Sequence, residues 1–212
     1  MIQPHVQTRN EEIVNALTHG VGVLLAIAGT AILIVRGALH GDAWHVVTFS
    51  IFGAGLINLY LASTLYHSAV GAKIKSFLNR FDHSSIYILI AATYTPFTLT
   101  SLRGPVGWVI FGIIWALAIA GVVFKVWFYT SKYRTLSAWL YLAMGWIIIF
   151  AIVPVIRSVP PLSLWLLASG CITYSLGPIF YLKTSIPFGH GIFHIFILGG
   201  SICHFLSLYH LL

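Results

Sequence analysis

Acidic residues are almost absent from this sequence. Only four of its 212 residues are Asp or Glu, and all charged residues together make up 7% of the chain. Soluble globular proteins contain about 25% charged residues, so an ordinary water-soluble domain is excluded. Because 59% of the residues are hydrophobic, we expect most of the protein surface to face lipid.

Cysteine is also scarce, since Cys171 and Cys203 are the two present and both fall within apolar runs. A disulfide framework is therefore not expected, and no cysteine spacing typical of a metal site occurs. The formal net charge of +7 could indicate nucleic-acid binding. However, the basic residues lie in short gaps between apolar runs, where they act as topology signals and headgroup contacts. We therefore expect the lipid bilayer as the main partner, with no nucleic acid and no evident protein partner.

Long apolar runs dominate the chain instead. A membrane-spanning helix needs roughly 20 mostly apolar residues. Runs of this length predict an all-α protein, a single seven-transmembrane helix bundle over residues 1–212. The expected spans are Ala16–Val35, Val46–Tyr66, Ser84–Leu102, Val106–Val126, Leu136–Ile156, Leu162–Leu182 and Ile192–Leu212.

The distribution of Lys and Arg predicts the orientation of these spans, because basic residues concentrate on the cytoplasmic side. An N-terminus inside the cell places eight basic residues on the inner side and three, Arg36, Arg103 and Arg157, outside. We therefore expect a multi-pass protein of the cell inner (plasma) membrane, with its N-terminus cytoplasmic and its C-terminus outside. The inner residues are Arg9, Lys73, Lys75, Arg80, Lys125, Lys132, Arg134 and Lys183.

Ionisable side chains within a membrane are costly and often functional. Here they gather at the expected inner face: His67 ends the second span, Asp82 opens the third, and His190 and His194 open the seventh. His190 and His194 are four residues apart, so both rings lie on one face of a helix. Three histidines with an open position are typical of catalytic Zn²⁺, although imidazole also suits iron, nickel and copper.

Two further polar side chains complete this prediction. Asp82 could hydrogen-bond a metal-bound water and accept its proton. Ser63 precedes His67 by one helical turn and could hydrogen-bond the same water or a substrate carbonyl. Two alternatives stay open: the histidines of the HxxxH pair could simply extend toward the headgroups, and Asp82 could cap the third helix ahead of His83.

Polar residues elsewhere allow more than one interpretation. Glu12, Asn15 and His19 share a helical face, which fits either a hydrogen-bond network near the metal or an amphipathic helix lying on the headgroups. His204, deep in the last span, is more typical of a hydrogen bond between helices than of a ligand.

These residues fall in segments with a recognisable order and spacing. The chain resembles the hemolysin III proteins, the bacterial branch of the progestin and adipoQ receptor family, over nearly its whole length. The segments that carry the resemblance are Glu11–Gly20, Ser63–His67, Asp82–Tyr87, His190–His194 and His204–Phe205.

The resemblance implies seven helices, a cytoplasmic N-terminus and an intramembrane zinc ion. It places the zinc ligands at His67, His190 and His194, a water-holding aspartate at Asp82 and the family's serine at Ser63. The receptors of this family are similar to a wider group of membrane hydrolases that includes alkaline ceramidases.

Three functions are compatible with these features. The leading hypothesis is a zinc-dependent hydrolase that cleaves a lipid amide or ester and serves membrane homeostasis. The second is a non-catalytic sensor or receptor-like protein whose zinc holds helices together. The third is a pore-forming hemolysin or transporter, which would need polar residues along a whole crossing, and the outer halves of the spans offer almost none beyond His204.

Overall fold

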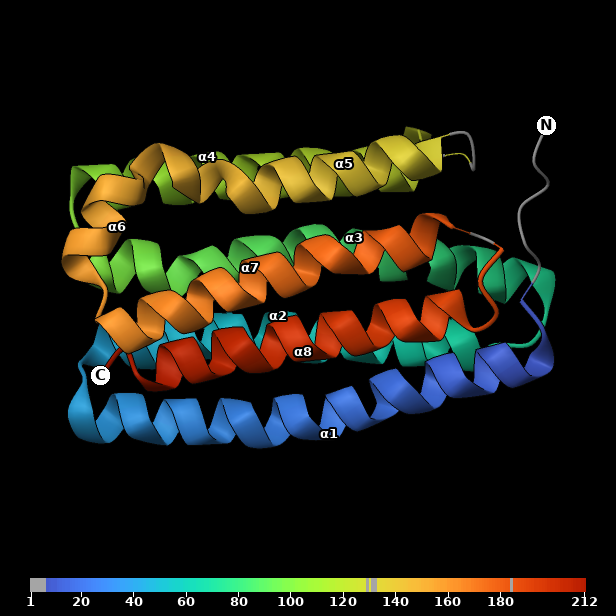
Figure 1. Cartoon of the computed structure of the whole chain (residues 1–212), viewed down its shortest axis with the longest axis horizontal. Helices are drawn as coiled ribbons and strands as arrows, with labels where there is room; N and C mark the ends of the chain where they lie inside the picture. Colours follow the sequence, from blue (N-terminus) through green and yellow to red (C-terminus); the bar gives the residue numbers. More distant parts are fainter. Residues whose placement is uncertain (1–6, 129, 131–132, 184) are drawn as a thin grey trace.

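A computed structural model describes residues 7–128, 130, 133–183 and 185–212. Within these ranges the chain contains helices and no strand, which confirms the all-α prediction. Long helices lie side by side along one axis in Figure 1. They are α1 (Arg9–His40), α2 (Ala43–Ser68), α3 (Ala72–Pro96), α4 (Pro105–Val123), α5 (Arg134–Gly145), α7 (Pro161–Leu182) and α8 (Gly189–Tyr209). The short helix α6 (Ile152–Ser158) lies at one end of the bundle and turns across this axis.

Three short segments extend or join these helices. A π-helical turn, Phe97–Ser101, continues α3, and another, Phe124–Phe128, continues α4. The 3₁₀ turn Trp146–Ala151 joins α5 to α6. Pro96 stands where α3 gives way to its π-helical turn, as expected for a residue that lacks the N–H needed for the α-helical ladder.

A side chain from another helix stabilises the break between α5 and α6. The Tyr94 hydroxyl of α3 donates to the carbonyl of Gly145 at 2.7 Å and accepts the N–H of Ile148 at 2.9 Å. Within a membrane, backbone groups freed by a helix break need a partner inside the protein. Tyr94 supplies that partner for both the carbonyl of Gly145 and the N–H of Ile148 at the break.

In the part of the chain that the structure describes, six helical segments are long and apolar enough to cross a membrane: α1, α2, α4 with its extension, α5–α6 taken together, α7 and α8. The structure therefore supports a multi-pass membrane protein. α3 is not among these segments, and its first half carries Lys73, Lys75, Arg80 and Asp82. Seven crossings and the cytoplasmic N-terminus stay predictions. Lys132, one of the residues on which the orientation rests, lies outside the described residues.

The structure corrects the expected start of the third helix. α3 begins at Ala72, ten residues before Asp82, so Asp82 lies inside the helix and cannot cap it. The charges before Ser84 indicate a gap between predicted spans. The segment nevertheless contains Lys, Ala, Leu and Arg, which are good helix formers. α1 likewise begins before the apolar run, at Arg9, because Thr8 and Glu11 form a reciprocal capping box.

We expect alkaline phosphatase fused after Leu212 to be active and green fluorescent protein fused there to be dark. The N-terminus is predicted to be cytoplasmic, and α8 ends at the end of the bundle opposite to the start of α1 (Figure 1). The measurement is to compare alkaline phosphatase and green fluorescent protein fusions at this position. The same reporters placed in the connection between α2 and α3 should give the reverse pattern. Cytoplasmic activity of the C-terminal fusion would contradict the predicted orientation.

Candidate metal centre

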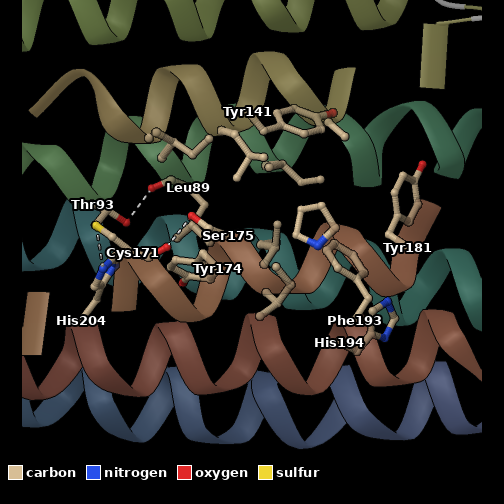
Figure 2. A pocket seen from close by; sticks show the side chains of 18 of the residues that line it. Leu89, Thr93, Tyr141, Cys171, Tyr174, Ser175, Tyr181, Phe193, His194 and His204 are labelled. Carbon is tan, nitrogen blue, oxygen red and sulfur yellow. Dashed lines mark hydrogen bonds between the residues drawn. The ribbon is translucent and has the colours of Figure 1, made fainter. Parts of the chain in front are cut away.

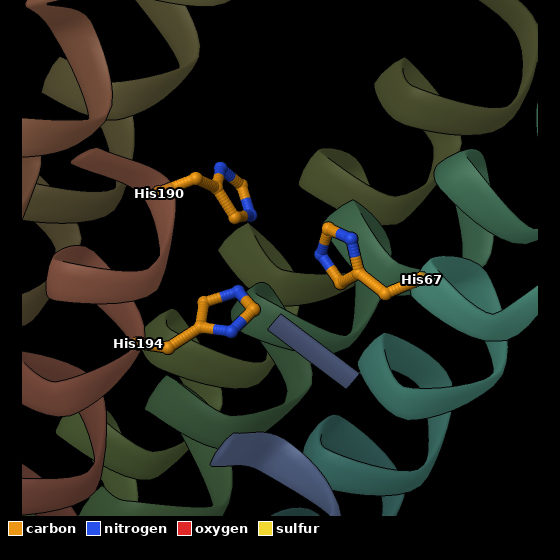
Figure 3. Close-up of side chains that lie close together, drawn as sticks. All are labelled: His67, His190 and His194. Atoms are coloured by element: carbon orange, nitrogen blue, oxygen red, sulfur yellow. The ribbon is translucent and has the colours of Figure 1, made fainter. Parts of the chain in front are cut away.

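Three histidines from two helices converge at one end of the bundle. His67 lies at the end of α2, and His190 and His194 lie in the first turns of α8. Their rings face one another in Figure 3, and each offers one nitrogen within 4.8 Å of the others. The HxxxH pair therefore acts from one helical face, and the third histidine comes from a different helix, as the sequence predicted.

Hydrogen bonding orients the ring of His67. Its Nδ1 lies 2.6 Å from the Oε2 atom of Glu12. A carboxylate oxygen accepts the hydrogen bond, so Nδ1 donates it and Nε2 carries the free lone pair. This Nε2 is buried and has no hydrogen-bond partner in the described part of the chain. A buried nitrogen with a free lone pair is costly unless it binds a ligand, and a carboxylate behind the ring is typical of metal-bound histidines.

His194 is oriented in the same way by α1. Its Nδ1 lies 3.2 Å from both the backbone carbonyl of Asn15 and the hydroxyl of Thr18. Because that hydroxyl donates to backbone carbonyls of α1, Nδ1 donates to the Asn15 carbonyl and Nε2 is the unprotonated nitrogen. The ring of His19 stacks on His194, with centroids 3.5 Å apart and an interplanar angle of 12°. Asn15 and His19 are buried, so this face of α1 packs on the cluster and does not lie on the headgroups.

His190 completes the cluster from a partly buried position. Its ring centroid lies 4.6 Å from that of His194 and 4.9 Å from that of His67. The ring of Tyr181 in α7 lies 5.7 Å away on another side. The donor set of three neutral imidazoles suits Zn²⁺, and the two nitrogens oriented by Glu12 and Asn15 fit a metal ion.

Asp82 and Ser63 lie next to the cluster. Both line a cavity that His19, His190 and His194 also line. The Ser63 hydroxyl faces Asp82, although its oxygen makes no hydrogen bond of normal geometry among the described residues. The structure thus brings the two predicted catalytic side chains to a cavity that two of the three histidines also line, without assigning them a role.

His83, the neighbour of Asp82, is satisfied by the protein itself. Its Nδ1 donates to the carbonyl of Asn79 at 2.8 Å, and its Nε2 accepts from the hydroxyl of Tyr181 at 3.2 Å. Both ring nitrogens are therefore occupied. This separates His83 from the three histidines of the cluster, although all four lie at one end of the bundle.

Sequence reasoning missed two basic residues at this site. Lys75 of α3 forms an ion pair with Glu12, which links α3 to the carboxylate behind His67. Lys125 is completely buried, with its Nζ 5.5 Å from the centre of the Tyr141 ring, and it interacts electrostatically with Asp82. Both were counted only as orientation signals. Lys125 lies within the expected span Val106–Val126, and a lysine inside a span is itself a signal of function.

A long apolar cavity extends from the cluster into the bundle. Its volume is about 150 Å³. Figure 2 shows His194, Phe193 and Tyr181 at one end, and His204 with Cys171 at the other. Along α7 the lining runs from Tyr181 to Leu167, fourteen residues apart, which is about 21 Å at 1.5 Å per residue. Half of a bilayer's hydrocarbon core is roughly 15 Å thick, so the lining extends over a length comparable with that of one lipid chain.

Comparison with known proteins identifies the family. A family model described as "Haemolysin-III related" matches residues 7–205. The chain is 48% identical over 198 residues to a "Hemolysin-3 homolog" of Bacillus subtilis (strain 168), which covers 93% of this chain and 92% of the relative. It is 47% identical over 191 residues to "Hemolysin-3" of Bacillus cereus, covering 90% and 87%. It is also 31% identical over 206 residues to the "Monocyte to macrophage differentiation factor" of Homo sapiens, covering 94% and 83%. The chain therefore belongs to the haemolysin-III-related family, as the resemblance in its sequence predicted.

Proposed function

We propose that this protein is a zinc-dependent hydrolase of the inner membrane, which cleaves an amide or ester bond of a membrane lipid. The observation that carries the proposal is the buried Nε2 of His67, which Glu12 orients and which has no hydrogen-bond partner among the described residues, in a cluster whose other two histidines line a long apolar cavity. A metal ion would satisfy this nitrogen, and the cavity would hold the lipid chain. The physiological role is membrane-lipid homeostasis.

The residues of the chain have distinct tasks in this reaction. His67, His190 and His194 would hold the zinc ion, which would supply Lewis acidity and lower the pKa of water to about 7. Asp82 is the general base that accepts a proton from the attacking water and passes it to the leaving group. The Ser63 hydroxyl donates a hydrogen bond to the carbonyl oxygen of the substrate. The apolar lining holds the chain and excludes bulk water from the bond that is cleaved.

A structural role for the metal is the second candidate, and one contact favours it. Glu12 of α1 binds both His67 of α2 and Lys75 of α3, so a metal that joins α2 to α8 would fasten four helices together. A sensor or receptor-like protein needs no more than this. A hydrated pore has less support, because the described cavity is lined mainly by apolar side chains.

Metal analysis tests the donor set directly. We expect the purified protein to contain about one zinc ion per chain, and His67→Ala, His190→Ala or His194→Ala to lose most of it, since two imidazoles bind zinc weakly. His210→Ala, at an exposed position, is the matched control and should keep its zinc. Inductively coupled plasma mass spectrometry gives the stoichiometry. A triple His-to-Ala variant with full zinc content would contradict the site.

Removing the charge behind His67 should weaken the metal without abolishing the site. We expect Glu12→Gln to reduce zinc affinity roughly 10- to 100-fold, because the carboxylate fixes the ring and increases its basicity. The matched control is Glu11→Gln, the neighbouring carboxylate of α1, which caps the helix and accepts the N–H of Phe188. Competition with a chelating dye measures both affinities. Equal affinities in the wild type and Glu12→Gln would show that Glu12 does not support the ligand.

Substitution of Asp82 separates catalysis from a structural role. We expect Asp82→Asn to keep its zinc and its melting temperature but to cleave lipid roughly 10²- to 10⁴-fold more slowly, because Asn cannot accept a proton as a carboxylate does. The measurement is product formation by mass spectrometry from a panel of amide and ester lipids. Undiminished cleavage by the variant would remove Asp82 as the base. Absence of cleavage by the zinc-loaded wild type across the panel would favour the structural role.

A further inference from the structure

Two exposed basic side chains share one face at the start of α3. Lys73 and Arg80 are seven residues apart, which is about two turns of helix, so they lie on the same face. Both are exposed, and the ion pairs formed between described residues involve other side chains. This face therefore carries two positive charges to which no carboxylate of the described chain is bound.

The acidic residues of the chain are engaged elsewhere, and all four of them lie within the described ranges. Glu12 pairs with Lys75, which lies about 200° around α3 from Lys73. Asp82 is buried within the bundle, and the other two acids take part in the caps of α1 and α2. An anion that meets Lys73 and Arg80 is therefore expected to come from outside the chain.

The side chain of Arg80 is held in position by α4. Its Nη1 donates to the carbonyl of Val126 at 3.3 Å, in the π-helical turn that continues α4. A guanidinium group has five N–H donors, and this bond occupies one of them. The remaining donors can form the short, charge-assisted hydrogen bonds that guanidinium makes with phosphate oxygens.

Exposed aromatic side chains accompany these charges. Phe77 lies between Lys73 and Arg80 on the same face and is 69% exposed, and Trp127, next to Val126, is 70% exposed. Aromatic rings beside basic side chains are typical of the boundary between lipid headgroups and acyl chains. This face of α3 therefore belongs at headgroup depth.

The same residues surround a depression in the protein surface. Lys73, Ser76, Phe77 and Arg80, together with Ala72, line a shallow hollow on α3. The hollow thus combines an ammonium group, a guanidinium group and a hydroxyl group with one apolar ring. Three kinds of hydrogen-bond donor around one apolar contact match a phosphate group attached to an acyl chain.

We propose that this hollow, which we call the α3 basic face, binds the phosphate group of an anionic phospholipid of the surrounding membrane. Lys73, Ser76 and Arg80 donate hydrogen bonds to the phosphate oxygens, and Phe77 packs on the first carbons of an acyl chain. A zwitterionic headgroup fits less well, because its own cation would lie near two positive charges. The inference does not depend on the proposed hydrolysis.

Binding of single lipids tests this site. The probes are phosphatidylglycerol and phosphatidylcholine with identical acyl chains, added to the purified full chain in a neutral detergent and counted by native mass spectrometry. We expect the wild type to bind phosphatidylglycerol roughly tenfold more tightly than phosphatidylcholine, a typical contribution of charge-assisted hydrogen bonds. The double variant Lys73→Gln/Arg80→Gln should bring this ratio to about one.

A second double variant, Arg9→Gln/Lys183→Gln, is the matched control. It removes the same two kinds of charge from exposed positions at the start of α1 and just after the end of α7. We expect it to keep the wild-type ratio. An equal fall in both double variants would show a diffuse attraction of basic residues to anionic lipid and would overturn the proposal.

The wild type alone decides the question even when the α3 variant fails to fold, because equal binding of the two lipids would overturn the site. Inorganic phosphate should displace phosphatidylglycerol no better than chloride of equal ionic strength, since a free ion gains nothing from Phe77. Displacement by phosphate alone would overturn the assignment to a lipid. Neither readout involves lipid cleavage, so a failure of the proposed hydrolase would leave the α3 basic face standing.

Discussion

The hydrogen bond between Glu12 and His67 is the contact on which the arrangement of the cluster depends. It fixes which nitrogen of His67 is free, and the ion pair with Lys75 holds the carboxylate in place. A half-buried carboxylate in a lipid-facing bundle is costly unless it is paired, and here one group satisfies a histidine and a lysine from two other helices. The ends of α1, α2 and α3 therefore cannot shift independently without leaving a charge or a donor unpaired.

The catalytic and the structural interpretations share this contact, and the cavity distinguishes them. A metal that only joins helices needs no space beside it. Here Asp82, Ser63 and two histidines of the cluster line one end of a cavity about 21 Å long, bounded mainly by apolar side chains. Space of this shape beside a candidate base is expected for an enzyme that handles a lipid chain. It is also compatible with a receptor that binds one, so lipid cleavage is the decisive measurement.

Much of the fold and part of the site could be predicted from the sequence, because they follow from local rules. Apolar runs of about 20 residues indicate spanning helices, and a spacing of four places His190 and His194 on one helical face. The partners of a side chain on other helices do not follow from such rules. The contacts of Glu12 with His67, of Asn15 with His194 and the burial of Lys125 depend on how each helix is rotated in the bundle.

The start of α3 shows a different limit. An apolar run indicates only the part of a helix that lies in lipid. The run that starts at Ser84 therefore predicts Asp82 at a helix end, whereas the helix begins at Ala72. Position along the membrane normal and position within a helix are separate quantities. For Asp82 the sequence indicated a place near the histidines, which the shared cavity supports, and misjudged the local backbone.

The break between α5 and α6 has a consequence for how this protein can change. Its freed backbone groups at Gly145 and Ile148 are bonded by the hydroxyl of Tyr94, which belongs to α3. The shape of the α5–α6 segment thus depends partly on a residue of α3. A chimera that exchanged residues 134–158 between distant relatives would inherit the bend without its support unless the recipient also carried a tyrosine at the matching place in α3. Exchange of the α5–α6 segment between relatives is therefore constrained by the sequence of α3, even though the exchanged residues are continuous in the chain.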